Sequence, residues 1–244
     1  MNAPAQSPAP IGPRAAPSAI STVFVLAGVT FTRLVRGRAL WVSLLVGVLP
    51  ILYALLMRGR DRAGVGDELF GFELLVLGIL APMFVASSLG EEIEERTATY
   101  LWSRPIPRWA VLAGKLATIV PLVAAIGIAS WLAASHAAWA RFAPAQTFLA
   151  IGVGAVALSL LAAAFSTLAA KHGMALAICY LLFFDLPAGS LPARLQEISV
   201  THQLRTLSGM WTSDGSFVEG LIGILAIMLV TGGLATWRIR RLEA

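Results

Sequence analysis

The densest group of side chains capable of chemistry lies between residues 91 and 108, in the stretch EEIEERTATYLWSRPIPR. Four glutamates, three arginines and two threonines meet here. Ile93, Tyr100 and Leu101 fall at helical spacing on one face, and Pro105 ends a helix. The pattern predicts a short amphipathic helix at the cytoplasmic mouth of a membrane protein. Because anionic lipid repels carboxylates, a protein partner would be the natural ligand of the acidic face.

We refer to residues 91–108 as the acidic segment. Its candidate docking residues carry a charge, a hydroxyl group or the helix-ending proline. They are Glu91, Glu92, Glu94, Glu95, Arg96, Thr97, Thr99, Arg104, Pro105 and Arg108. Charged cytoplasmic loops are common in membrane proteins and most are simply solvated, so this alternative stays open on the residues alone.

Four further polar or reactive residues interrupt apolar stretches. Glu73 and Asp185 would each lie near the end of a membrane helix, either as hydrogen-bonded structural groups or along a substrate path. Lys115 would lie about two turns into another helix, with its side chain extended to the cytoplasmic face. Cys179, the only cysteine, is expected to pack as a small hydrophobic residue.

The remaining reactive residues do not form a recognisable site. His136, His172 and His202 have no helical ligand spacing, which argues against a zinc site. Neither Lys115 nor Lys171 precedes a serine or threonine, so the sequence has no G-x-x-x-x-G-K-[ST] phosphate loop. We therefore expect this chain to bind neither ATP nor a metal ion itself.

Membrane-spanning helices must position these residues. Of the 244 residues, 58% are hydrophobic and 13% are charged, whereas soluble domains carry about 25% charged residues. Continuous apolar runs predict an all-α integral membrane fold, because only helices and closed barrels satisfy their backbone in lipid. The six predicted spans are 39–57, 69–90, 109–134, 142–170, 173–191 and 220–237.

Two stretches precede the first predicted span. Residues 1–18 are rich in proline, alanine and serine, which predicts a disordered tail before a single transmembrane domain over 19–244. The apolar stretch 19–31 is short for a span and an arginine cluster follows it. We therefore expect a helix that lies along the cytoplasmic membrane surface.

The distribution of positive charge predicts the orientation. With a cytoplasmic N-terminus, twelve of the 18 Lys and Arg residues fall inside and six fall outside. Short loops with more Lys and Arg face the cytoplasm. After six crossings the C-terminus is expected to be cytoplasmic as well.

An ordered pattern joins the acidic segment to the helix after it. In sequence order its positions are Glu94, Ala98-Thr99, Leu101, Ser103, Pro105, Arg108 and Gly114-Lys115. The pattern resembles the permease subunits of type-2 ABC exporters, the ABC-2 type family. In that family a Glu, a Gly-Thr pair, a leucine-rich stretch, a Ser-x-Pro-x-x-Arg turn and a Gly-Lys link the second and third helices. Ala98 departs from the pattern, since the family usually has glycine there.

The resemblance implies half of an exporter, in the bacterial cytoplasmic (inner) membrane. The acidic segment would be the coupling helix that docks into a cleft of a separate ABC ATPase, and that ATPase would bind the ATP and Mg²⁺. A second permease copy or a homologue would complete the transporter. Residues 19–31 would be the family's elbow helix, and 192–217 would hold short re-entrant helices between spans five and six.

Two other functions remain open. A membrane-embedded enzyme would use Glu73, Asp185 or His202 and would be active without an ATPase. A membrane assembly factor, for example in the maturation of a metalloenzyme, would dock partners without moving a substrate.

Overall fold

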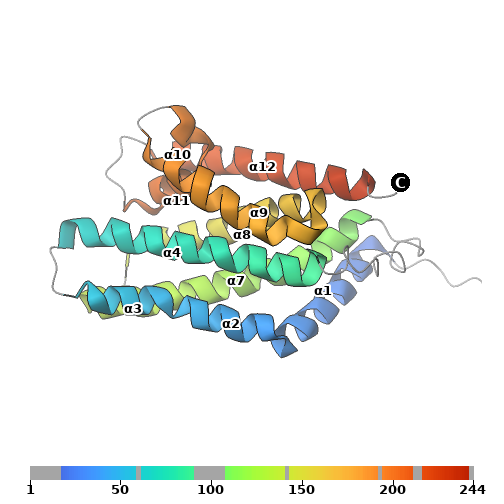
Figure 1. Cartoon of the computed structure of the whole chain (residues 1–244), viewed down its shortest axis with the longest axis horizontal. Helices are drawn as coiled ribbons and strands as arrows, with labels where there is room; N and C mark the ends of the chain where they lie inside the picture. The colour runs from blue at the N-terminus through green and yellow to red at the C-terminus, as the bar shows by residue number, and fades with distance from the viewer. Residues whose placement is uncertain are drawn as a thin grey trace, which may run out of the picture.

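The structure is a computed structural model. It describes residues 18–58, 62–90, 108–140, 143–191, 194–210 and 216–241. These described residues are mostly helical, with no strand among them. The long helices lie side by side in a bundle (Figure 1). The predicted tail, apart from Ser18, falls outside the described residues.

The first helix runs obliquely to the rest of the bundle (Figure 1). α1 (Ala19–Arg36) begins at Ser18, whose hydroxyl oxygen accepts a hydrogen bond from the Ser21 N–H at 3.2 Å. It ends at Gly37, which is extended at φ −80° and ψ 157°. The chain changes direction there into α2 (Arg38–Gly47) and then α3 (Leu49–Leu56), which together follow the bundle.

Six helices of the described residues are long and apolar enough to cross a membrane. They are Ala19–Arg36, Arg38–Leu56, Val65–Leu89, Arg108–Trp139, Ala145–Leu168 and Phe217–Arg241. A multi-pass membrane protein is therefore supported, with the predicted number of long apolar helices. These six helices differ from the six predicted spans in two respects.

The first difference is α1, which we expected to be too short to span. The helix continues through the arginine cluster to Arg36 and has 18 residues, about 27 Å of helix. The second difference is the predicted fifth span. Gly173–Gly189 is apolar but shorter than the six long helices, because the chain leaves the helical path at Leu191.

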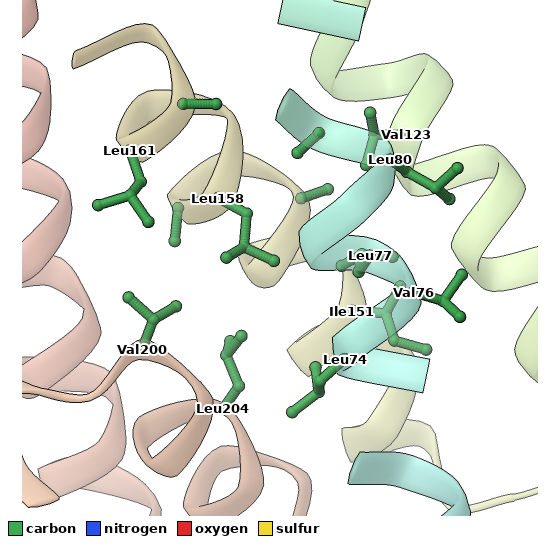
Figure 2. Packing of buried hydrophobic residues seen from close by; sticks show 14 of the residues in the cluster. Leu74, Val76, Leu77, Leu80, Val123, Ile151, Leu158, Leu161, Val200 and Leu204 are labelled. Carbon is green, nitrogen blue, oxygen red and sulfur yellow. The ribbon is translucent and has the colours of Figure 1, made fainter. Parts of the chain in front are cut away.

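α4 (Arg62–Val85) is the most buried of the long helices and packs against α7 (Arg108–Trp139) and α8 (Ala145–Leu168). Figure 2 shows leucines of α4 facing Val123, Ile151 and Leu204 of neighbouring helices. Glycine makes this close packing possible, because a Cβ atom at Gly127 would overlap Leu77 Cδ1. Small residues are the usual means of close helix packing in membranes.

α12 (Phe217–Arg241) forms one outer side of the bundle (Figure 1). Its start is a reciprocal capping box: the Ser216 N–H donates to Glu219 Oε2 at 2.9 Å, and the Glu219 N–H donates to Ser216 Oγ at 3.3 Å. Along the helix, Leu229 and Val230 are exposed, as lipid-facing residues would be.

The path between α8 and α12 is broken into short pieces. α9 (Gly173–Tyr180) continues through a π-helical turn, η3 (Leu181–Asp185), into α10 (Leu186–Ser190). The 3₁₀ turn η4 (Arg194–Ile198) and α11 (Val200–Ser208) follow. Cys179, on α9, is exposed. We expected it to pack as a small hydrophobic residue, but its side chain is not buried among the described residues.

Candidate functional site

The helix that precedes the acidic segment ends, and the helix that follows it begins, at the same end of the bundle. Figure 1 shows the end of α4, the start of α7, α1 and the C-terminus gathered there. Nine of the candidate docking residues lie outside the described residues. They are Glu91, Glu92, Glu94, Glu95, Arg96, Thr97, Thr99, Arg104 and Pro105. Arg108 is described, as the first residue of α7.

The chain enters the acidic segment through a π-helical turn, η1 (Ala86–Gly90), at the end of α4. The last carbonyl groups of a helix have no hydrogen-bond partner within it, and here side chains donate to them. Ser87 Oγ donates to the Phe84 carbonyl at 3.1 Å, and Ser88 Oγ donates to the Val85 carbonyl at 3.3 Å. Lys115 Nζ, from α7, donates to the carbonyl oxygen of Ser88.

Lys115 does not extend to the aqueous surface as expected, because its side chain is only 3% exposed. The ammonium group instead lies at the C-terminal end of α4. The carbonyl oxygens at the C-terminal end of a helix carry partial negative charge, which stabilises a cation. Lys115 therefore joins α7 to the end of α4, at the point where the acidic segment begins.

The residue before Lys115 brings α1 against α7. A Cβ atom at Gly114 would lie 3.0 Å from the Val23 carbonyl oxygen and 3.0 Å from Leu26 Cβ, so only glycine permits this approach without a shift. One turn further along α7, Thr118 Oγ1 donates to the Ala27 carbonyl oxygen at 2.8 Å. The Gly-Lys pair thus connects three elements: α1, α7 and η1.

Arg108 connects the exit of the acidic segment to the last turn of α12. Its Nη1 atom donates to the Arg240 carbonyl oxygen at 3.5 Å. Beside it, the Arg241 guanidinium group lies 4.4 Å above the Trp237 ring, a cation–π contact. The start of α7 and the end of α12 are therefore held together where the acidic segment ends.

Glu73 lies in the interior, between α4 and α7. Its side chain is fully buried, and Ser130 Oγ donates to Oε2 at 2.9 Å. Oε1 is also buried and has no hydrogen-bond partner among the described residues. A Cβ atom at Gly127, one turn before Ser130, would lie 3.7 Å from Oε1. The sequence placed Glu73 near a helix end in contact with water, and the structure places it in the packed core.

Asp185 anchors α11. Its Oδ1 atom accepts the Val200 N–H at 2.7 Å and Oδ2 accepts the Thr201 N–H at 3.0 Å. These are two of the N–H groups that a helix N-terminus leaves without an internal partner, and a carboxylate there is stabilised by the helix dipole. Ser199 Oγ also donates to the Asp185 carbonyl oxygen at 3.0 Å. Both oxygens of this carboxylate are thus engaged within the chain.

A cavity of about 720 Å³ lies between α8, α11 and α12. Leu161 and Val230 line its apolar part, and Gln203 and Glu219 its polar part. His202 faces it too; burial lowers the pKa of this imidazole, and nearby Arg205 lowers it further. Neither Glu73 nor Asp185 is among the lining residues, so the two candidate path residues do not meet in this cavity.

The described residues contain no group of three or more His, Cys, Asp or Glu side chains that could hold a metal ion. No family model matches the chain, and no curated protein matches it either.

Sequence reasoning did not identify the partners of the charged side chains. Ser88, Thr118 and Ser130 were unremarkable small polar residues in apolar runs. Their roles depend on which helix lies opposite, and periodicity carries no such information. Ser199 did carry a local signal, because a serine before a helical stretch is a common N-cap.

Proposed function

We propose that this chain is the membrane-spanning permease subunit of an ATP-driven exporter of the ABC-2 type. A separate ABC ATPase would bind ATP and Mg²⁺ and dock on the acidic segment, and a second permease copy or a homologue would complete the transporter. The observation that carries the proposal is the ordered motif from Glu94 to Lys115. Its last two positions, Gly114 and Lys115, connect α1 and η1 to α7.

The arrangement of the described flanks supports a mechanical role for the acidic segment. Its entrance is bound to α7 through Lys115 and its exit to α12 through Arg108. A force applied to the segment by a partner would therefore act on α4, α7 and α12 together. Such a link is what a rocking motion of half a transporter requires.

Co-purification of the full chain with a candidate ABC ATPase, followed by assays of ATP turnover, tests this function. We expect Glu94→Ala with Arg108→Ala to weaken the complex and to lower permease-dependent turnover at least tenfold. The matched control is Arg194→Ala with Glu197→Ala, which removes the same charges from exposed positions on η4. Equal loss in both double variants, or none in either, would contradict the docking assignment.

The proposed orientation places the chain in a bacterial inner membrane, with both termini in the cytoplasm. In a Cys179→Ser background, we expect Ser213→Cys to react with an impermeant maleimide in intact cells. Thr97→Cys should react only after permeabilisation. The reverse pattern would overturn the orientation and leave the docking proposal to be tested separately.

A membrane-embedded enzyme is the competing proposal. The carboxylate of Asp185 is already bound to two backbone N–H groups, which disfavours a catalytic role for it. The buried Oε1 atom of Glu73 is the observation that favours the enzyme. Turnover of a substrate by the purified chain without an ATPase, abolished by Glu73→Gln, would support that alternative.

A further inference from the structure

An open groove of about 450 Å³ runs along the bundle where α7, α8 and α12 meet. Leu112 and Leu116 of α7 and Leu160 of α8 form its apolar walls, with Gly232 of α12 beside them. Thr236 also lines it, but Thr236 Oγ1 donates to the Gly232 carbonyl oxygen at 2.7 Å. The hydroxyl is thus satisfied within its own helix, and the wall remains apolar.

The length of the groove is comparable to the thickness of one leaflet. Along α12 it extends from Gly232 to Arg240, about 12 Å at 1.5 Å per residue. Along α7 it extends from Trp109 to Leu116, about 10 Å. Half of a hydrocarbon layer of about 30 Å is about 15 Å. The groove therefore covers most of the depth of one leaflet.

The mouth of the groove is basic. Arg240 lines it, and the Nη1 atom of Arg108 lies 3.5 Å from the Arg240 carbonyl oxygen. Trp109 lies at the same end, and tryptophan is typical of the level of lipid head groups. None of the described lining residues is acidic. Guanidinium groups bind phosphate through paired hydrogen bonds, so charge complementarity favours an anionic head group.

We propose that this groove binds an acyl chain of an anionic phospholipid from the surrounding membrane, with the lipid phosphate at Arg240. Gly232 keeps the groove open. A Cβ atom there would lie 3.5 Å from Leu160 Cδ2, so a larger side chain would enter the space of the lipid chain. This site requires no ATPase and holds whether or not the chain is a permease.

The chain offers a matched control for each part of the site. A Cβ atom at Gly233, next to Gly232, would have no neighbour within 4 Å, so Gly233→Leu adds the same side chain outside the groove. Arg241 is stacked on Trp237 and does not line the groove, so Arg241→Gln removes the same charge as Arg240→Gln.

The test is native mass spectrometry of the full chain in detergent, titrated with palmitoyl-oleoyl phosphatidylglycerol or with the phosphatidylcholine of the same chains. The wild type should retain phosphatidylglycerol preferentially. Gly232→Leu should lose the tightest-bound lipid, whereas Gly233→Leu should keep it. Arg240→Gln should weaken phosphatidylglycerol binding about fivefold, weaken phosphatidylcholine binding less, and exceed any effect of Arg241→Gln.

Equal affinity of the wild type for the two lipids would overturn the proposal, as would equal binding by Gly232→Leu and Gly233→Leu. If Gly232→Leu does not fold, the two arginine variants decide alone, and equal effects of those two would also refute the site. A change from dimer to monomer in Gly232→Leu, with lipid retention intact, would identify the groove as a contact between copies and exclude the lipid.

Discussion

The ammonium group of Lys115 on α7 donates a hydrogen bond to the carbonyl oxygen of Ser88, in the π-helical turn that ends α4. This contact joins η1, which precedes the acidic segment in the sequence, to α7, which follows it. It also explains why a lysine is buried at this place: the helix end supplies partial negative charge.

Replacement of Lys115 by methionine tests this contact. The side chain keeps a similar length but cannot donate, so the Ser88 carbonyl stays buried without this donor. We expect the free energy of unfolding to fall by about 1–2 kcal/mol and hydrogen exchange of residues 86–90 to accelerate. Lys171→Met, which changes the exposed second lysine, should alter stability by less than about 0.5 kcal/mol. Similar effects of the two variants would contradict the role of Lys115.

The burial of Lys115 also predicts its reactivity. In the detergent-solubilised chain, an amine-acylating reagent should modify Lys171 rapidly and Lys115 at least tenfold more slowly, because Lys115 is 3% exposed. Mass spectrometry of the digested chain measures both. Comparable rates at the two lysines would show that the Lys115 side chain reaches the aqueous surface, as we expected from the sequence.

Loss of the Asp185 carboxylate should release the start of α11. Asp185→Ala removes the acceptor of two backbone N–H groups, and we expect a loss of about 2–3 kcal/mol of stability. Asp185→Asn retains one acceptor oxygen and should lose roughly half of that. Thermal unfolding in one detergent compares them, with the exposed Glu197→Gln as the control. A harmless Asp185→Ala change would show that α11 does not depend on this anchor.

The pairing of Glu73 with Ser130 can be measured by a double-mutant cycle. Ser130→Ala removes the hydroxyl that donates to Oε2, and we expect a loss of about 1 kcal/mol. Ser135→Ala is the matched control on the same helix, because its hydroxyl bonds only locally, to the Leu132 carbonyl oxygen at 3.2 Å. In a Glu73→Met background, which keeps a similar length but has no carboxylate acceptor, the cost of Ser130→Ala should fall, and a zero coupling energy would argue against the pairing.

The helical class of the fold and the approximate places of its long helices could be predicted from the sequence, because runs of apolar residues record burial in lipid directly. The end of each helix was harder to predict. Charged residues do not stop a helix, so α1 continues through Arg33 to Arg36, beyond the apolar stretch that we took as its limit. The π-helical turn at Leu181–Asp185 has no sequence signature in an apolar run.

The candidate site could be predicted only as a set of residue types. Glu73 and Asp185 stood out because carboxylates are rare in apolar runs. Their different roles depend on contacts with Ser130 and with the backbone of Val200, which lie 57 and 15 residues away in the sequence. Such pairings depend on how the helices are arranged, and a single sequence does not specify that arrangement.

We propose that the acidic segment docks on a separate ABC ATPase, and site-specific photocrosslinking can test this claim. A photoreactive amino acid at position 97 should crosslink the full chain to the co-purified ATPase, whereas the same amino acid at position 197, on η4, should not. An intact complex with no crosslink from position 97, or with equal crosslinking from both positions, would contradict the claim.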